Sequence, residues 1–253
     1  MRQRERPRRV RLGLPSGSVE QEAASCYSDG SEVPGDMDKD LIKSRKSLFS
    51  SLSRNVRAES VIRAMEQVPR EQFVPLESRH MAYLDLPLSI GEGQTISQPY
   101  IVALMAAALG LRKRDRVLEV GTGSGYQAAI LSLLVPQGQV VSVELVPILA
   151  ERARVLLGAL GYGNVEVHLA GPTMGCPSRA PFDAIVVAAT SPRLPKSLVS
   201  QLAPGGRLVI PIGTLEQQDL VQVLRTDEGL SFRMLGPCRF VPLIGREAFP
   251  APR

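Results

Sequence analysis

A glycine-rich segment is the part of the sequence best suited to binding a ligand. Residues 117–125 read VLEVGTGSG, a β-branched run that leads into Gly121, Gly123 and Gly125. Glycines between a strand and a helix let the main chain approach a ligand closely. The spacing differs from the GxGxxG of dinucleotide sites, and the segment lacks the Gly-Lys-Ser/Thr of a phosphate-binding loop. The pattern therefore favours a ligand that carries an adenosine but no phosphate.

An acidic residue stands at the matching place on the next expected strand. Glu144 ends the apolar run 140–144 and lies 19 residues beyond Gly125. A carboxylate there can accept hydrogen bonds from both ribose hydroxyls of an adenosine. The alternative is a tight turn whose glycines serve helix–strand packing, with Glu144 merely solvated. Together the two features resemble the S-adenosylmethionine site of class I methyltransferases.

Alternating strands and helices surround these residues. The expected strands cover 116–120, 140–144, 165–169, 182–189 and 207–212, separated by helices. Apolar strands spaced by helices predict a parallel sheet covered on both faces. Two further strands, 218–225 and 230–235, follow without a helix between them, so we expect an antiparallel end. The expected fold is a doubly wound, three-layer α/β sheet of Rossmann-like type, with its ligand crevice at the carboxyl ends of the central strands.

The chain divides into three expected regions. Residues 1–40 are rich in Arg, Ser, Gly, Pro and Glu and predict a disordered tail. Residues 41–110 predict an N-terminal helical segment and a loop that runs from 84 to 98. Residues 111–253 predict the cofactor-binding α/β core with the C-terminal strands. The role of the tail and the true translation start stay open.

Composition excludes several classes of protein. The net charge of +5, the aromatic fraction of 4% and the absence of tryptophan argue against a nucleic-acid binder. Three scattered cysteines and two histidines argue against a disulfide framework and a metal site. No apolar stretch approaches the roughly 18 residues of a membrane span, and six arginines in the first eleven residues do not make a secretory signal. We expect a cytoplasmic monomer with no metal and no membrane association.

Six ordered blocks narrow the family. They read VPREQFVP (68–75), AYLDLPLSIG (82–91), GQTISQPYIVA (93–103), PFDAI (181–185), LAPGGRLVIPIG (202–213) and FVPL (240–243). Together they closely resemble the protein-L-isoaspartate O-methyltransferase family, over about Val56 to Gly245. The resemblance implies methyl transfer from S-adenosylmethionine to the free carboxylate of L-isoaspartyl residues in damaged proteins. The ester then closes to a succinimide, which can open to normal aspartate.

This chemistry suits the sequence. The substrate carboxylate is already an ionised nucleophile, because its unperturbed pKa is about 4. The sulfonium of the methyl donor is already activated, so neither a general base nor a metal is required. Catalysis then depends mostly on proximity and orientation.

The resemblance also implies site residues. Ser97 matches the active-site serine of the family, and its hydroxyl would orient the substrate carboxylate. Its spacing alone predicts an N-cap for the helix that begins near Gln98, and both roles can coexist. Asp85 either shapes the substrate loop or serves a turn or helix cap. The expected cofactor-binding residues are Thr95, Ile96, Glu119, Gly121, Thr122, Gly123, Gly125, Glu144, Gly171 and Pro172.

One segment departs from the family pattern. The family has Gly-Asp-Gly after the third strand, whereas this chain has Ala170, Gly171 and Pro172, and Cys176 replaces a tryptophan. In the family that aspartate hydrogen-bonds the adenine amino group, an interaction worth about 1.5–3 kcal/mol. Its loss predicts cofactor binding that is weaker by roughly tenfold to 150-fold.

Three functions therefore remain open in the sequence. The first is a working isoaspartyl methyltransferase with a rebuilt adenine pocket. The second is a catalytically degenerate member that binds proteins. The third is methylation of another acceptor, such as RNA or a small molecule, which only the arginine-rich start supports. The preferred peptide context also stays open.

Overall fold

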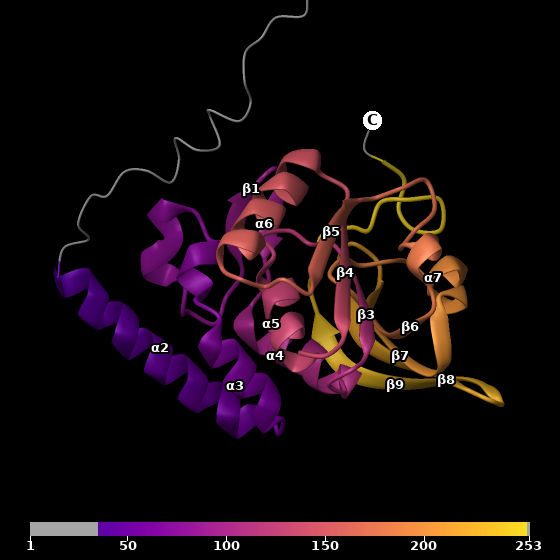
Figure 1. Cartoon of the computed structure of the whole chain (residues 1–253), viewed down its shortest axis with the longest axis horizontal. Coiled ribbons are helices and arrows are strands. Elements are labelled where there is room, and N and C mark those ends of the chain that lie inside the picture. Colours follow the sequence, from indigo (N-terminus) through magenta and orange to yellow (C-terminus); the bar gives the residue numbers. More distant parts are fainter. Residues whose placement is uncertain (1–34, 252–253) are drawn as a thin grey trace, which may run out of the picture.

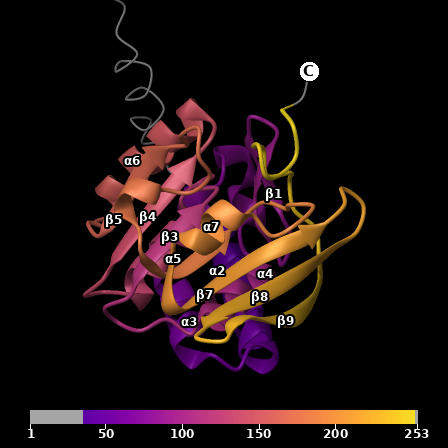
Figure 2. The same cartoon turned by 90° about the vertical axis from the view of Figure 1, so that its right-hand side faces the viewer.

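Seven strands form one sheet in this computed structural model, which describes residues 35–251 (Figure 1). They are β3 (Arg116–Val120), β4 (Gln139–Glu144), β5 (Val165–Leu169), β6 (Phe182–Val187), β7 (Leu202–Gly213), β8 (Gln218–Thr226) and β9 (Gly229–Cys238). The strand order is β5-β4-β3-β6-β7-β8-β9. Neighbouring strands from β5 to β7 in this order pair in parallel. β8 pairs antiparallel with both β7 and β9 (Figure 2). The predicted mostly parallel sheet with an antiparallel end is confirmed.

Both faces of the sheet are covered. Val117 of β3 packs in a buried cluster with Met105 and Leu131, which belong to α4 (Pro99–Leu109) and α5 (Tyr126–Leu134). α6 (Pro147–Ala159) packs beside α5 on the same side. Leu118, the next residue of β3, faces the other cluster, with Leu198 of α7 (Lys196–Ser200) and Leu243. Since successive strand residues point to opposite faces, two buried faces require the unbroken apolar runs seen in the sequence.

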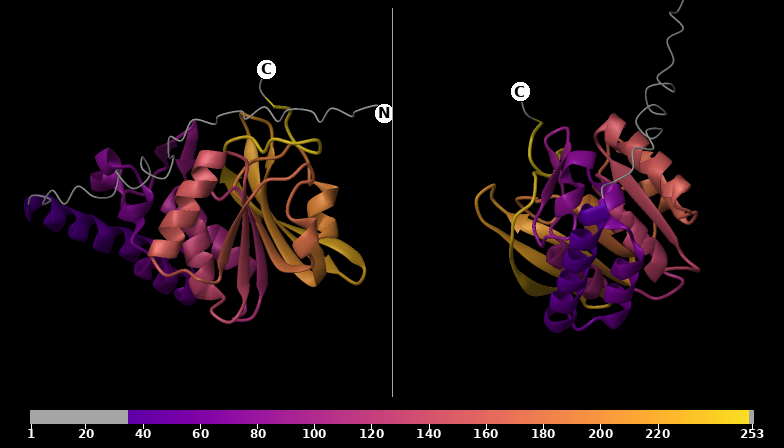
Figure 3. Two further views of the ribbon diagram at one scale, coloured as in Figure 1. Left: turned by 45° about the horizontal axis from the view of Figure 1, so that its top comes forward. Right: turned by 90° about the vertical axis from the view of Figure 1, so that its left-hand side faces the viewer.

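The N-terminal segment packs on the side of α5. It comprises α2 (Gly35–Asn55), α3 (Glu59–Gln67) and the 3-10 turns η1 (Arg70–Phe73) and η2 (Leu76–Met81). Val61 and Met65 of α3 share a buried cluster with Ile130 of α5. Figure 3 shows α2 at the opposite end of the molecule from the antiparallel strands. The predicted tail, residues 1–40, lies outside the described residues except for 35–40, which α2 includes.

Part of the predicted loop 84–98 is a hairpin. β1 (Leu88–Gly91) pairs antiparallel with β2 (Gln94–Ile96). The three tip residues from Gly91 to Gly93, including Glu92, all have positive φ. Strands of three and four residues are too short for alternation to reveal them. The hairpin matters because β2 leads directly into Ser97.

Within residues 35–251, no helix is long and apolar enough to cross a membrane.

Gly138, which lies between α5 and β4, packs closely against the main chain at the start of β3. A Cβ added to Gly138 would lie 2.1 Å from the Asp115 carbonyl oxygen. Relieving that clash requires main chain at the start of β3 to move, so we expect Gly138→Ala to destabilise the protein by about 1–3 kcal/mol. Thermal unfolding measures the change.

Gly158→Ala in α6 is the matched control. Within residues 35–251, no atom lies within 4 Å of a Cβ added to Gly158. Alanine costs less backbone entropy in a helix than glycine, so this variant should gain roughly 0.5 kcal/mol. Equal melting temperatures for the two variants would contradict the packing described at Gly138.

Candidate active site

A cavity of about 380 Å³ lies above the carboxyl ends of the central strands. Val120 at the end of β3, Glu144 at the end of β4 and Ala188 just after β6 all line it. β3 lies between β4 and β6 in the sheet, because the chain passes outward through β4 and β5 before it returns to β6. Open α/β sheets bind ligands at such a reversal of strand order.

The three glycines of the loop have different roles. Gly121, Gly123 and Gly125 have φ values of +96°, +53° and +88°, which L side chains rarely adopt. Gly121 and Gly123 line the cavity, whereas Gly125 does not. A Cβ added to Gly125 would lie 3.2 Å from Leu157 of α6. The first two glycines therefore expose main chain to a ligand, and the third allows α6 to pack closely.

Glu144 ties the glycine loop to the end of β4. Its side chain is buried and lines the cavity. One carboxylate oxygen accepts the Gly123 N–H at 2.8 Å, and the other accepts the Val146 N–H at 3.0 Å. The alternative of a merely solvated Glu144 is therefore wrong. Each oxygen keeps a second lone pair, so the carboxylate can still accept hydrogen bonds from a ribose.

Glu119 supports the loop from below. Its side chain is fully buried and does not line the cavity. Its Oε2 lies 2.5 Å from Ser142 Oγ, which in turn lies 2.5 Å from the Thr122 hydroxyl. Thr122 lines the cavity, so a hydrogen-bond chain runs from the core to the ligand surface. Burial raises the pKa of Glu119 to about 8; the bond to Ser142 acts against this shift and the charge of Glu144 adds to it.

Asp85, not Ser97, caps α4. The N-cap residue is Gln98, and no side chain at that position makes a capping bond. The Tyr100 N–H instead donates to Asp85 Oδ1 at 2.8 Å, and Gln98 Nε2 donates to Asp85 Oδ2 at 3.1 Å. The cap predicted for Ser97 is therefore wrong, and the cap alternative for Asp85 is confirmed.

Because Asp85 caps α4, the Ser97 hydroxyl is not used as a helix cap. Ser97 lines the cavity together with Thr95 and Ile96, which precede it. Its hydroxyl makes no hydrogen bond to any residue in the described range 35–251. A hydroxyl at a cavity wall with no internal partner can both donate to and accept from a ligand.

The segment that departs from the family pattern borders the cavity. Gly171 and Pro172 line it. Gln201 Nε2 donates to the Met174 carbonyl at 2.8 Å, and Gln201 Oε1 accepts the Cys176 N–H at 2.8 Å. The buried Gln201 amide thus holds this segment in place. The cavity remains open beside it.

Two contributions were not predicted from the sequence. Residues 241–247 line the cavity, anchored by a 2.8 Å hydrogen bond from the Leu243 N–H to the Thr190 carbonyl. The FVPL block was the only signal for this segment. Gln127 of α5 also lines the cavity, and its buried Nε2 has no partner within the described residues. Its position two residues after Gly125 carried no signal.

The charged groups in the wall are few. They are Glu144, Arg246 and Glu247, and the described lining includes no histidine, cysteine or lysine. Such a wall is suited to hold and orient a ligand by hydrogen bonds.

Comparisons with known proteins agree with this geometry. The family model described as protein-L-isoaspartate(D-aspartate) O-methyltransferase matches residues 43–248. A protein-L-isoaspartate O-methyltransferase of Roseiflexus sp. (strain RS-1) is 51% identical over 85% of this chain and 98% of the relative. One of Ignicoccus hospitalis is 50% identical over 78% of this chain and 97% of its own length.

Solved structures give the same result. A protein-L-isoaspartate O-methyltransferase superposes with a TM-score of 0.73 at 32% identity, over 81% of this chain and 67% of that chain. A structure from Plasmodium falciparum, described as the same kind of enzyme in complex with S-adenosyl-L-homocysteine, superposes with a TM-score of 0.68 at 26% identity. That match covers 78% of this chain and 96% of the other.

The raised pKa of Glu119 predicts how the free energy of unfolding depends on pH. The folded state keeps its proton up to a pKa of about 8, whereas the unfolded state loses it near 4.5. The folded state therefore binds more protons between these values, and this group makes stability fall by about 1.4 kcal/mol per pH unit as the pH rises. Glu119→Gln keeps an acceptor for Ser142 and cannot ionise, so its unfolding free energy should fall less steeply between pH 5 and 8.

Urea denaturation across that range measures both slopes. Parallel curves for the two proteins would show that Glu119 is ionised in the folded state.

Proposed function

The chain belongs to the protein-L-isoaspartate(D-aspartate) O-methyltransferase family, and we propose that it methylates the free carboxylate of L-isoaspartyl residues in damaged proteins with S-adenosylmethionine as the methyl donor. One observation carries the proposal. A single cavity combines the glycine loop, the strand-end Glu144 and the Ser97 hydroxyl, which has no hydrogen-bond partner among residues 35–251.

The cavity fits an adenosine-bearing methyl donor. The Gly121 and Gly123 main chain borders it without side chains, and Glu144 retains acceptor capacity for ribose hydroxyls. Gln127 Nε2, which has no hydrogen-bond partner among the described residues, offers a further donor in the same wall. We assign cofactor binding to these residues together with Thr95, Ile96, Thr122, Gly171 and Pro172. Glu119 and Gly125 do not line the cavity. Glu119 supports Thr122 through Ser142, and Gly125 allows α6 to pack against the loop.

Ser97 orients the acceptor. S-adenosylmethionine supplies a sulfonium whose methyl group is already reactive toward an ionised carboxylate. The protein therefore needs to align two reactants rather than move a proton, and alignment can supply several kcal/mol of the barrier reduction. A hydroxyl with no internal partner can donate to one carboxylate oxygen and leave the other free to attack. Asp85 acts indirectly, by capping the helix that follows Ser97.

The competing functions have less support. A binding module without turnover would not need an open cofactor cavity, yet the cavity persists beside Gly171 and Pro172. The arginine-rich start that favoured an RNA acceptor lies outside the described residues. Isoaspartyl-containing proteins and peptides are thus the proposed partners. Monomeric state and cytoplasmic location stay predictions.

Ser97→Ala tests the proposed role of the hydroxyl. We expect kcat for transfer of labelled methyl groups to an isoaspartyl peptide to fall by roughly 10- to 100-fold, because the carboxylate loses its alignment. Affinity for S-adenosylhomocysteine, measured by calorimetry, should change by less than about threefold.

Ser89→Ala is the control, because Ser89 is exposed on the same hairpin and does not line the cavity. A matched aspartyl peptide should accept no label from any variant. Full kcat in Ser97→Ala would remove Ser97 from the mechanism.

Gly171→Asp tests the missing adenine acid. No atom of the described residues lies within 4 Å of a Cβ added to Gly171, and the φ of Gly171 is outside the left-handed region. The main chain at Gly171 therefore accommodates a side chain, and the aspartate should raise the affinity for S-adenosylhomocysteine by roughly tenfold to 150-fold. Calorimetric titration measures the change.

Gly163→Asp, at an equally open glycine in the turn before β5, adds the same charge away from the cavity and should leave the affinity unchanged. Equal affinities for both variants would show that this loop does not reach the adenine.

A further inference from the structure

Arg70 buries a charged side chain behind the cavity wall. Its exposed fraction is 0%, and it forms no ion pair within residues 35–251. Its Nε donates to the Ala82 carbonyl at 2.8 Å, and its Nη2 donates to the Ser97 carbonyl at 2.9 Å. The guanidinium carbon lies 4.7 Å from the centre of the Tyr126 ring. Its Nη1 has no acceptor among the described residues.

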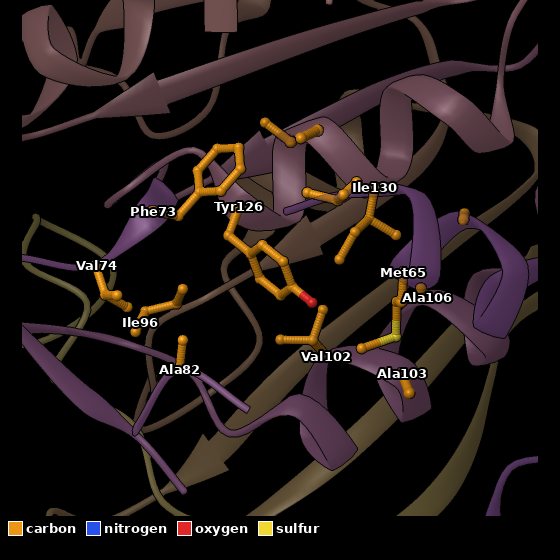
Figure 4. Packing of buried hydrophobic residues seen from close by; sticks show 14 of the residues in the cluster. Met65, Phe73, Val74, Ala82, Ile96, Val102, Ala103, Ala106, Tyr126 and Ile130 are labelled. Carbon is orange, nitrogen blue, oxygen red and sulfur yellow. The ribbon is translucent and has the colours of Figure 1, made fainter. Parts of the chain in front are cut away.

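These partners join the two halves of the site. Ser97 is the proposed substrate-orienting residue, and Tyr126 begins the helix that follows the glycine loop. Both line the cavity, whereas Arg70 does not. Figure 4 shows Tyr126 among side chains from several elements, including Phe73 of η1 and Val102 of α4. Arg70 therefore connects the Ser97 main chain to the cofactor loop without reaching the ligand.

Among the described residues, no carboxylate forms an ion pair with the buried Arg70. Glu71 accepts a 2.6 Å hydrogen bond from the Tyr83 hydroxyl, and Asp85 caps α4. Burial of a guanidinium costs several kcal/mol of desolvation free energy. The two carbonyls and the Tyr126 ring compensate only part of this cost. Burial accordingly lowers the pKa of Arg70, and Tyr126 and Asp85 act against this shift. Because a guanidinium stays protonated in proteins, a positive charge nevertheless lies directly behind the Ser97 carbonyl.

We propose that Arg70 is a positioning residue for methyl transfer, which fixes the Ser97 main chain relative to Tyr126 and places a positive charge behind the substrate carboxylate. This inference rests on the proposed function. It assigns Arg70 two separable contributions: the planar hydrogen-bonding fork sets geometry, and the charge attracts the anionic acceptor.

Two substitutions separate these contributions. Arg70→Lys keeps the charge, but a single ammonium cannot reproduce the two-carbonyl fork and the flat contact with Tyr126. We expect kcat for an isoaspartyl peptide to fall by roughly 10- to 100-fold, with affinity for S-adenosylhomocysteine within about threefold. Arg70→Met removes the charge as well, so the KM for the peptide should also rise, by about tenfold or more.

Arg207→Lys is the matched control for a purely structural role. Arg207 also donates to two main-chain carbonyls, at 2.8 Å to Leu109 and 3.1 Å to Gly110, at the far end of α4 from Ser97. Unlike Arg70, it also forms an ion pair with Asp115. It does not line the cavity. Its substitution should lower the melting temperature and leave kcat within about threefold.

Two results would overturn the proposal. One is an Arg70→Lys variant with kcat within about threefold of the wild-type value. The other is a loss of kcat that runs parallel to losses of melting temperature and S-adenosylhomocysteine affinity, which would make Arg70 a structural residue. If Arg70→Lys does not fold, Arg70→Met carries the test, and failure of both to fold also assigns Arg70 to stability alone.

The wild-type protein distinguishes failure of the proposed function from failure of the role assigned to Arg70. Wild-type protein that binds S-adenosylhomocysteine but leaves isoaspartyl peptides unmethylated would contradict the proposed function itself. Active wild-type protein with active Arg70 variants would contradict only the role of Arg70.

Discussion

The carboxylate of Glu144 is the interaction on which the site depends. It accepts one N–H from the glycine loop and one from the chain just beyond β4. These bonds hold the carboxyl ends of β3 and β4 together at the point where the strand order reverses. A parallel sheet leaves main-chain groups unpaired at this edge, and a buried carboxylate satisfies two of them while still facing the cavity.

The hairpin and α4 form the opposite part of the cavity wall, where Asp85 caps the helix and Ser97 faces the cavity. A helix N-terminus leaves several N–H groups without partners, and Asp85 supplies the acceptor from the preceding loop. A serine that capped its own helix would turn its hydroxyl toward that helix. Because Asp85 does this work, Ser97 can face the cavity, with Arg70 behind its carbonyl.

Hydrogen bonds from below and beside the cavity support its two ligand-facing loops. Glu119 and Ser142 reach Thr122 from the core, and Gln201 anchors the segment around Met174 and Cys176. The chain thus has the family fold and a formed cavity with Gly171 and Pro172 in its wall.

Local pattern in the sequence determined the sheet, its antiparallel end and the glycine loop, because unbroken apolar runs and strand–glycine–helix junctions depend on neighbours a few residues apart. Strand ends such as Val120 and Glu144 followed from the same pattern. Only the tertiary structure decided that Gly125 packs against α6, that Glu119 lies beneath the cavity and that residues 241–247 close its wall. The cap of α4 by Asp85 and the burial of Arg70 behind Ser97 join residues 15 and 27 positions apart. Such contacts arise when separate elements pack together, and no periodicity along the chain encodes them.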